Sequence, residues 1–225
     1  MHATKSFFDT DARTLALRLL GATLHRRFAP RRIATLRIVE TEAYVGPEDA
    51  CSHARNAKRT ERNRAMFGPP GIAYVYFTYG MHHCFNVVCG NPDRPAAVLI
   101  RAAEPLRLAH LLRSAPHAKA PTSGPARLCR ALDIDRRLDS IPLRPCAPLW
   151  ISPGEPPRRV AVSARVGVSQ GSAWTTAPLR FFDPESPWVS TRRGPYAGSI
   201  LSDPAARPYH PGLWFLRSGD RPTEG

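Results

Sequence analysis

The chain has 225 residues, enough for one large domain or two small ones with a sizeable core. Hydrophobic residues make up 43% and charged residues 22%, values that are ordinary for a globular protein and exclude disorder throughout the chain. Lys and Arg number 32 against 18 for Asp and Glu, which gives a net charge of +14. A fold does not need such an excess, so it favours a polyanionic partner, with nucleic acid before membrane; a compositional bias toward arginine is the alternative.

Cysteine usage and the hydrophobic pattern favour a reducing, membrane-free location. The five cysteines include no Cys-x-x-Cys pair, which argues against a disulfide framework and against a cysteine-rich zinc site. The first residues lack the apolar stretch of a secretory signal. Residues 65–92 carry no Lys, Arg, Asp or Glu, but their prolines, glycines and alternating aromatics indicate strands and a turn rather than a membrane span. We expect a cytoplasmic or nucleoid protein with no membrane partner.

The first elements expected along the chain are a helix and a strand. Apolar residues in 12–20 follow helical spacing, with Asp9 or Thr10 as the N-cap and Gly21 at the end. Residues 34–44 alternate as a strand does. Period-two alternation places the following residues on one face: Leu36, Ile38, Glu40, Glu42 and Tyr44. Two acidic side chains beside aliphatic ones indicate a cleft.

The middle and end of the chain mix strands with helices. Residues 72–88 predict a β-hairpin that turns at Gly80, and 98–100 a short buried strand. Pro105 is expected at the start of a helix whose apolar face holds Leu108, Leu111 and Leu112. Residues 122–125 are expected to cap a second helix that runs to Leu132, and 142–157 to form a surface loop. Further strands are expected at 160–168, 179–182 and 188–190.

This order predicts an α+β fold, a single mixed domain without regular βαβ alternation. We expect the domain to span residues 1–192. The Gly- and Pro-rich segment 193–225 is expected to be a peripheral C-terminal extension.

A carboxylate, an imidazole and several tyrosines fall within one strand–loop–hairpin unit. Glu40 or Glu42 is a candidate to activate water, His53 follows nine residues after Tyr44, and the hairpin supplies the tyrosines. Enzymes that act on a base in DNA extract it from the stack and hold it between aromatic faces. A carboxylate then activates water and stabilises the developing positive charge on the sugar. Alternation alone does not choose between the two glutamates.

Two rival functions remain open on these residues. His82, His83 and Asn86 resemble a metal-dependent nuclease site, although adjacent residues of a strand point to opposite faces and make poor joint ligands. The second rival function is that of a non-catalytic DNA-binding protein that inserts the hairpin into DNA. Such a protein would bind with steep salt dependence and release no base.

Seven segments, in order between about residues 6 and 192, resemble the alkyladenine (3-methyladenine) DNA glycosylase family. They are 37–49 (RIVETEAYVGPED), 62–67 (RNRAMF), 74–81 (YVYFTYGM), 99–105 (LIRAAEP), 124–132 (GPARLCRAL), 164–168 (ARVGV) and 186–190 (SPWVS). The resemblance implies a curved, mainly antiparallel sheet and a protruding hairpin that enters the DNA minor groove. It also implies a monofunctional enzyme that flips an alkylated or deaminated purine and hydrolyses its N-glycosidic bond, leaving an abasic site.

The resemblance assigns residue roles. Glu42 falls on the catalytic carboxylate and Arg101 on an arginine near the catalytic water. The base-pocket positions are Tyr44, His53, Met66, Tyr76, Asn86, Val166 and Gly167, with Asn86 matching the residue that clashes with the 2-amino group of guanine. The intercalation positions are Tyr79, Met81 and His82; the last is a departure, since a bulkier aromatic is expected there. Contacts to the DNA backbone are expected from Lys58, Arg59, Ser123, Gly124 and Arg127.

The partner implied is double-stranded DNA that contains a damaged purine, bound by a monomer. Candidate lesions are 3-methyladenine, 7-methylguanine, hypoxanthine and ethenoadenine. No cofactor and no metal are expected, and no lysine is placed as a Schiff-base nucleophile.

Overall fold

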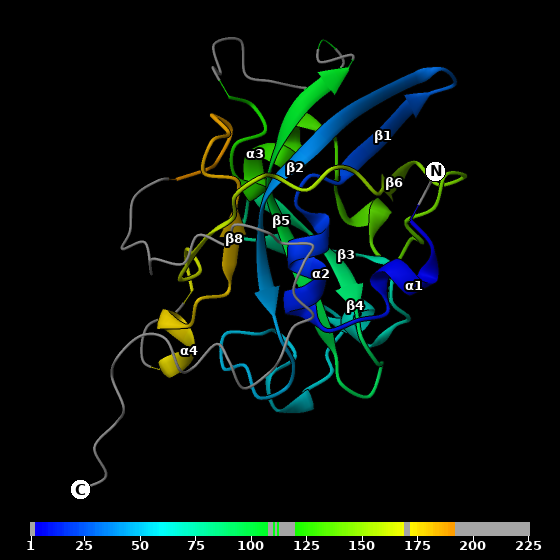
Figure 1. The fold of residues 1–225 in the computed structure, drawn as a ribbon. Coiled ribbons are helices and arrows are strands. Elements are labelled where there is room, and N and C mark those ends of the chain that lie inside the picture. Colours follow the sequence, from blue (N-terminus) through cyan, green and yellow to red (C-terminus); the bar gives the residue numbers. More distant parts are fainter. Residues whose placement is uncertain (1–2, 108–109, 111, 113–119, 169–171, 192–225) are drawn as a thin grey trace, which may run out of the picture.

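The computed structural model describes residues 3–107, 110, 112, 120–168 and 172–191, and their strands form one antiparallel sheet (Figure 1). The strand order is β3–β4–β5–β2–β1–β6, and β8 pairs with both β2 and β7. The strands are β1 Thr23–Ala29, β2 Arg32–Tyr44, β3 Ala73–Thr78, β4 His82–Cys89, β5 Ala96–Arg107, β6 Leu149–Ser152, β7 Ala161–Ser163 and β8 Arg180–Phe182. The curled sheet and its few helices make a single mixed domain, which confirms the predicted α+β class.

The helices are all short (Figure 1). They are α1 Lys5–Phe8, α2 Ala12–Leu19, α3 Pro125–Ala131 and α4 Ala173–Thr176, with 3-10 turns η1 Arg55–Ala57, η2 Arg64–Phe67 and η4 Arg136–Leu138. Helix α2 contacts β2 and β5, while α3 contacts β4 and β5. The largest hydrophobic cluster joins Leu15 and Leu19 of α2 to Leu128 of α3 and Ile100 of β5. Each such fully buried leucine stabilises the fold by about 2 kcal/mol.

A β-bulge at Val39 changes the faces of β2. The register with β5 passes from Ile38↔Ala103 to Glu40↔Ala102 and then to Thr41↔Ile100, so Val39 is an extra residue on β2 and Arg101 is an extra residue on β5. Before the bulge, Leu36 and Ile38 lie in the hydrophobic core. After it, the odd-numbered residues face the core, because Ala43 belongs to the core cluster and Thr41 Oγ1 donates to the carbonyl of Ala16 on α2. The predicted single face is therefore wrong: the two glutamates lie opposite the aliphatic residues.

The bulge explains why acidic and aliphatic residues share one alternating strand. The two extra residues cancel in the register, but each strand changes its parity there, and a change of one moves every later side chain to the other face. Glu40, Glu42 and Tyr44 thus leave the core face of β2. They reach the face on which the candidate site lies.

Strands β3, β4 and β5 also separate core from site by alternation. Val75, Phe85, Val87 and Val98 belong to the main core. Residues of opposite parity, including Tyr74, Val88 and Ala97, belong to a second, small cluster with Met66 of η2. The same three strands therefore support the core on one face and a pocket on the other.

Several predicted elements differ from the structure. Asp11, and not Asp9 or Thr10, caps α2, since its carboxylate accepts from the N–H of Arg13 at 2.9 Å and of Thr14 at 3.0 Å. Pro105 does not start a helix but lies in β5, opposite Leu36. Leu108 and Leu111 lie outside the described residues, while Leu112 is buried.

The C-terminal third has more structure than predicted in one place and less in others. The expected surface loop 142–157 contains β6, which pairs with β1, itself unpredicted. The expected strand 160–168 is limited to β7, and residues 188–190 are not a strand. Gly124 rather than a side chain occupies the cap position of α3. The extension 193–225 lies outside the described residues.

The helices of the described residues were also compared with the length and hydrophobicity that a membrane span requires. None of its helices is long and apolar enough to cross a bilayer.

Candidate active site

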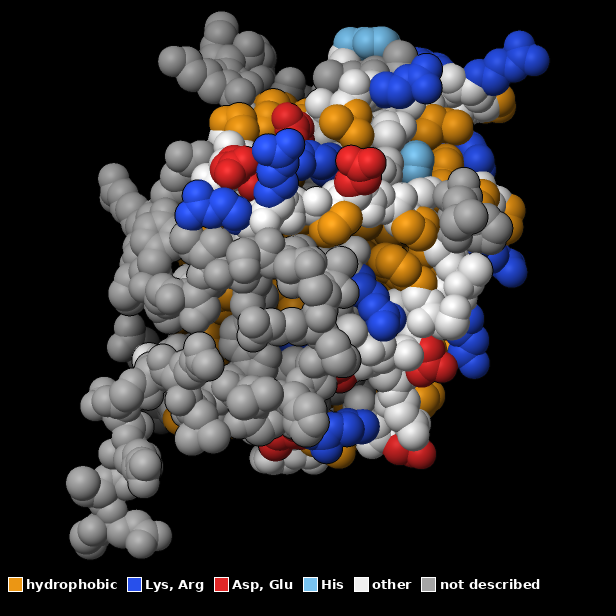
Figure 2. Space-filling view, viewed as in Figure 1, with side chains coloured by type: hydrophobic (Ala, Val, Ile, Leu, Met, Phe, Trp, Pro, Cys, Tyr) orange, Lys and Arg blue, Asp and Glu red, His pale blue; other side chains and the backbone are white. Residues whose placement is uncertain are grey.

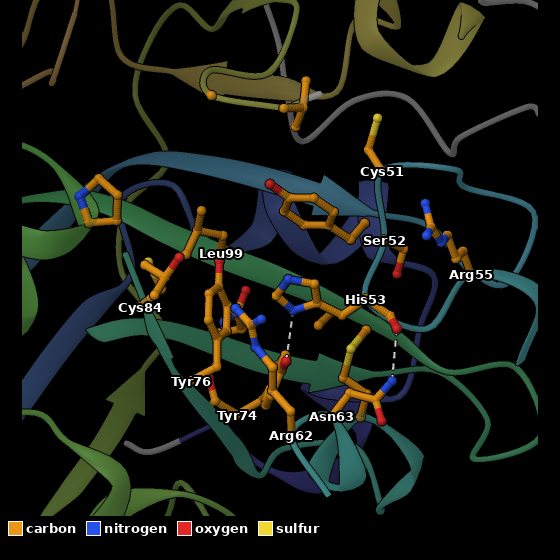
Figure 3. Close-up of a pocket in the computed structure, with 18 of the residues that line it drawn as sticks. Cys51, Ser52, His53, Arg55, Arg62, Asn63, Tyr74, Tyr76, Cys84 and Leu99 are labelled. Atoms are coloured by element: carbon orange, nitrogen blue, oxygen red, sulfur yellow. Dashed lines mark hydrogen bonds between the residues drawn. The ribbon is translucent and has the colours of Figure 1, made fainter. Parts of the chain in front are cut away.

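A pocket of about 890 Å³ lies on the site face of β3, β4 and β5 (Figure 3). Its walls include ten of the residues expected from the sequence: Tyr44, His53, Lys58, Met66, Tyr76, Tyr79, Asn86, Arg101, Val166 and Gly167. Seven others do not line it: Glu42, Arg59, Met81, His82, Ser123, Gly124 and Arg127. None of the described residues that line the pocket is acidic. Four of them carry positive charge: Arg55, Lys58, Arg62 and Arg101.

Cross-strand register brings the site residues into one row. Tyr74 pairs with Asn86, Asn86 with Leu99, and Leu99 with Glu42. Glu42 pairs in turn with Arg180 on β8. Directly paired residues of antiparallel strands lie about 5 Å apart, so residues distant in sequence become neighbours across five strands.

Glu42 is fully buried and lies directly behind the pocket wall. Its Oε1 accepts a 2.7 Å hydrogen bond from the N–H of Val166 and lies 3.2 Å from Nη1 of Arg101. Its Oε2 accepts from the hydroxyl of Tyr44 at 3.2 Å. All three of these partners line the pocket, and Glu42 itself does not, so a single layer of residues lies between Glu42 and the pocket.

Arg101 connects Glu42 to the second buried glutamate. Its Nε donates to Oε1 of Glu40 at 2.7 Å, and its Nη2 donates to the hydroxyl of Ser190 at 3.2 Å. Burial opposes the charge of Arg101, but Glu42 and Glu40 outweigh that cost and raise its pKa. The guanidinium therefore stays charged between two carboxylates.

A second buried ion pair braces the wall that contains Tyr44. Asp49 and Arg165 have fully buried side chains, and Nη1 and Nη2 of Arg165 donate to the carboxylate at 2.5 and 2.8 Å. Arg165 also donates to the carbonyls of Ala43 and Trp174, and its guanidinium lies 4.6 Å from the ring centroid of Tyr44. The pair fixes the loop after β2 to the loop that holds Val166.

His53 is held at the pocket by its neighbours (Figure 3). Its Nδ1 lies 2.8 Å from the hydroxyl of Tyr74, and its ring centroid lies 4.5 Å from that of Tyr76. The buried amide of Asn63 donates to the carbonyls of His53 and Lys58, at 2.8 Å each, and shapes the intervening loop. Partial burial among the pocket walls, followed by the charge of Arg62, lowers the pKa of His53 to about 4. The ring is therefore neutral at physiological pH.

The tyrosines of the pocket are neutral as well. Burial raises the pKa of Tyr44 well above its ordinary value, and the nearby Glu42 adds to the effect. Burial likewise raises the pKa of Tyr74 and of Tyr76. The Arg62 guanidinium lies 5.2 Å from the ring centroid of Tyr76. The pocket thus presents uncharged aromatic surfaces with guanidinium groups against two of them.

Asn86 and Met66 form fixed parts of the pocket wall. The Asn86 amide donates to the carbonyl of Tyr74 at 3.1 Å, and its side chain is almost fully buried. Met66 is buried in the small cluster beneath the loop. Gly167, by contrast, has a φ of +77°, and nothing lies close to where a Cβ would stand. Val166 and Gly167 are both exposed at the rim.

The turn between β3 and β4 presents an exposed tyrosine. Tyr79 is 80% exposed and Met81 69%, whereas His82 is half-buried in β4. Tyr79 and Gly80 have φ of +51° and +67°, and the N–H of Met81 donates to the carbonyl of Thr78. Positive φ at both central residues suits a tight hairpin turn, but it is unusual for a bulky residue such as tyrosine.

The proposed phosphate site at α3 has fewer free donors than the sequence suggested. The N–H of Ser123 donates to Ala120, that of Gly124 donates to Arg101, and the Ser123 hydroxyl donates to Val189. Pro125 at the first helical position has no N–H. Arg127 is exposed.

Positive charge beside the pocket is concentrated in one loop. Figure 2 shows Lys and Arg side chains spread among hydrophobic and acidic ones over the visible face. The segment from Arg55 to Arg64, at the start of η2, by contrast carries five exposed Lys or Arg side chains: Arg55, Lys58, Arg59, Arg62 and Arg64. The sequence analysis expected only Lys58 and Arg59 to contact the DNA backbone. The high density of Lys and Arg in residues 55–64 is the sequence signal that could have indicated the other three basic residues.

The three residues of the rival nuclease interpretation, His82, His83 and Asn86, make separate contacts, and the Asn86 amide donates to the carbonyl of Tyr74. Within the described residues, no group of three or more His, Cys, Asp or Glu side chains is arranged to hold a metal ion. His82 pairs with Thr78, while the ring of His83 lies 5.0 Å from that of Phe77.

Sequence reasoning missed five residues that support the site: Asp49, Ser190, Arg165, Arg180 and Asn63. All but Arg180 lie inside the segments that carry the family resemblance. Their place in those segments is the sequence signal that could have identified them.

Comparison with known proteins identifies a family and several close relatives. A family model for methylpurine-DNA glycosylase matches residues 6–187. A mouse protein named DNA-3-methyladenine glycosylase is 42% identical over 200 residues, which cover 82% of this chain and 60% of the mouse protein. The human protein of the same name is 41% identical over 201 residues, 82% of this chain and 66% of its own. A protein of Methanocella arvoryzae is 41% identical over 192 residues, 84% of this chain and 95% of its own.

Proposed function

The chain belongs to the methylpurine-DNA glycosylase family, and on this basis we propose that it is a DNA repair enzyme. It flips an alkylated or deaminated purine out of duplex DNA and hydrolyses the N-glycosidic bond. The substrates proposed are 3-methyladenine, 7-methylguanine, hypoxanthine and ethenoadenine. The product is an abasic site, and the enzyme is monofunctional.

One arrangement carries the proposal: a buried carboxylate in hydrogen-bond contact with three parts of an aromatic pocket wall. Glu42 contacts the N–H of Val166, the hydroxyl of Tyr44 and the guanidinium of Arg101. A carboxylate in that place is suited to take a proton from water and to stabilise positive charge on a sugar held in the pocket.

The proposed reaction is a single hydrolytic step. Water attacks C1′ of the deoxyribose as the bond from C1′ to the purine nitrogen breaks, and the bonding electron pair leaves with the base. Glu42 accepts the proton released by the water. A cationic methylated base leaves as a neutral molecule, whereas hypoxanthine or ethenoadenine also requires a proton.

In the structure, Tyr44 and Val166 separate Glu42 from the pocket, and Glu42 itself has no exposed surface. The proposal therefore requires a small movement of Tyr44 or of the rim at Val166 and Gly167 to admit the water. Gly167 has open space around it, which favours movement of the rim.

We assign the pocket residues to recognition of the flipped base. Tyr44, His53 and Tyr76 stack on it, and a neutral His53 does not repel a cationic methylated purine. Met66 and the rim at Val166 and Gly167 complete the wall. Asn86, fixed by its bond to the Tyr74 carbonyl, opposes the 2-amino group of normal guanine.

The remaining assignments concern the duplex. Tyr79, flanked by Met81 and His82, fills the space left by the flipped nucleotide from the minor groove. Lys58, Arg59, Arg127 and the start of α3 at Ser123 and Gly124 contact phosphates. We propose that the protein acts as a monomer in the cytoplasm or nucleoid, a reducing compartment that suits its five free thiols.

Release of free base tests this function directly. Methylated DNA and a hypoxanthine-containing duplex are each incubated with the protein in EDTA, and released purine is measured by chromatography. Free purine together with an alkali-labile site is the expected result. A folded, DNA-binding protein that releases no base would overturn the enzyme and favour the non-catalytic rival; activity lost in EDTA, with direct strand breaks, would favour the nuclease.

A further inference from the structure

Glu40 is buried two residues before Glu42 and does not reach the pocket. Its Oε1 accepts from Nε of Arg101 at 2.7 Å, from Nε of Arg180 at 2.7 Å and from the Ser190 hydroxyl at 2.9 Å. Its Oε2 accepts from the N–H of Ser190 at 2.6 Å. Four donors converge on one carboxylate that has no contact with any substrate space.

Glu40 holds the arginine that contacts Glu42. The guanidinium of Arg101 is planar, so fixing its Nε fixes the direction of its Nη1. That Nη1 lies 3.2 Å from Oε1 of Glu42. The ion pair with Glu40 therefore sets the position of Arg101 against the proposed base, and Ser190, bonded to both Glu40 and Arg101, closes the arrangement.

Glu40 also determines the charge around Glu42. Burial by itself would raise the pKa of Glu40, but Arg101, Arg180 and the Ser190 N–H outweigh it, and the pKa lies below its ordinary value. Glu40 thus stays ionised. Two carboxylates then face two guanidiniums, and the cluster is electrically balanced.

The other groups around Glu42 leave this balance unchanged. Tyr44 contacts it, Tyr76 and Cys84 of β3 and β4 interact with it at longer range, and all three are uncharged. Arg165 on the pocket loop is already paired with Asp49. Without Glu40, the positive charges of Arg101 and Arg180 would act on Glu42 alone and make it a weaker base.

We propose that Glu40 is a positioning residue for base excision: it orients Arg101 toward Glu42 and offsets the charge of Arg101 and Arg180, so that Glu42 remains an effective base. The inference rests on the proposed role of Glu42. It assigns to the first glutamate of the Glu-Thr-Glu run a task distinct from that of the second.

The test is the pH dependence of single-turnover base release by the full chain and by Glu40→Gln. We expect the rate to fall by about 100-fold, as for a misoriented catalytic group. The acid limb of the profile, which reports protonation of the base, should move about one pH unit or more to lower pH. Binding to DNA that contains an abasic-site analogue should stay near that of the parent. A folded Glu40→Gln with the parental rate and acid limb would overturn the proposal.

Two further variants keep the test decisive if Glu40→Gln does not fold. Ser190→Ala removes one donor to Glu40 and one acceptor for Arg101 but keeps their charges, so its rate should fall by a smaller factor while its acid limb stays at the parental pH. A parental rate in Ser190→Ala would overturn the orienting role. Thr41→Val is the matched control, because Thr41 lies between the two glutamates and its buried hydroxyl bonds only toward α2. An equal fall in rate in Thr41→Val would show a merely structural effect.

Failure of this inference is distinct from failure of the proposed function. If the parent chain releases no base, the function fails. If the parent is active and Glu42→Gln is not, while Glu40→Gln matches the parent in rate and profile, only the role of Glu40 fails.

Discussion

The main-chain N–H of Val166 donates a 2.7 Å hydrogen bond to Oε1 of Glu42, joining residues 124 positions apart in the chain. This bond places a buried carboxylate of β2 against the exposed rim of the pocket. The chemistry proposed for the protein depends on that contact, and the first prediction concerns the carboxylate.

Glu42→Gln should abolish most base excision. The amide keeps the shape of the side chain and can still accept from Val166, but it cannot take a proton from water. We expect a rate lower by about 10²- to 10⁴-fold, the usual contribution of a general base, with DNA affinity near that of the parent. Single-turnover release of hypoxanthine measures it. Glu48→Gln, the same change at an exposed carboxylate paired with Arg94, is the control; a Glu42→Gln enzyme as fast as this control would contradict the assignment.

Tyr79→Ala should weaken capture of the flipped nucleotide without loss of fold. The side chain is 80% exposed and packs on little, so its removal costs the fold little. Loss of one base-stacking contact corresponds to about 1–3 kcal/mol, or roughly a tenfold or larger loss of lesion affinity. A fluorescent purine analogue in the duplex reports flipping. Phe77→Ala, near the end of β3, is the matched control, because the Phe77 ring packs beside His83; equal losses from both changes would argue against a wedge at Tyr79.

Asp49→Asn should destabilise the protein strongly. It leaves the Arg165 guanidinium buried without its counter-charge, which typically costs about 3–5 kcal/mol. Urea unfolding measures the difference in free energy. The adjacent Glu48→Gln breaks an exposed pair and should cost about 1 kcal/mol or less. Similar values for the two variants would mean that the buried pair does not brace the loops.

His53 should titrate near pH 4 in the folded protein, which its ring signals in NMR will report. Its pKa is lowered from 6.5 to about 4, so the folded state binds fewer protons than the unfolded state between these values. Stability should therefore fall as the pH drops from about 6.5 to about 4, and His53→Gln should lose less stability over that range. A midpoint near 6.5 in the folded protein would contradict the environment described for this ring.

Much of the fold was predictable because its signals are local. Helical spacing in 12–20, strand alternation in 34–44 and the turn at Gly80 each depend on residues within one element, and the structure contains these elements. Pro105 failed as a helix start because strand pairing with Leu36 outweighs the local preference of proline. Strands β1 and β6 were missed because their sequences alternate weakly and their pairing is decided by contacts across the chain.

The candidate site was predictable as a set of residues but not as a geometry. Resemblance placed Glu42, Tyr44, His53, Tyr76, Asn86 and Arg101 together, and the structure brings them to one face; their roles stay predictions. It did not reveal that Glu40 and Arg180 share a buried cluster with Arg101, or that Asp49 pairs with Arg165. Those pairs join residues more than sixty positions apart, and no local pattern reports them.

The amino-acid sequence by itself determined the α+β class, the α2 helix and the set of candidate site residues, because periodicity, turn chemistry and motifs are properties of short segments. Only the tertiary structure decided which face Glu40 and Glu42 occupy. Irregular pairing at Val39 of β2 and Arg101 of β5 moves them from the aliphatic face to the pocket face. Bulges depend on how two distant strands pair, so the energy that selects this arrangement exists only once β2 and β5 are side by side.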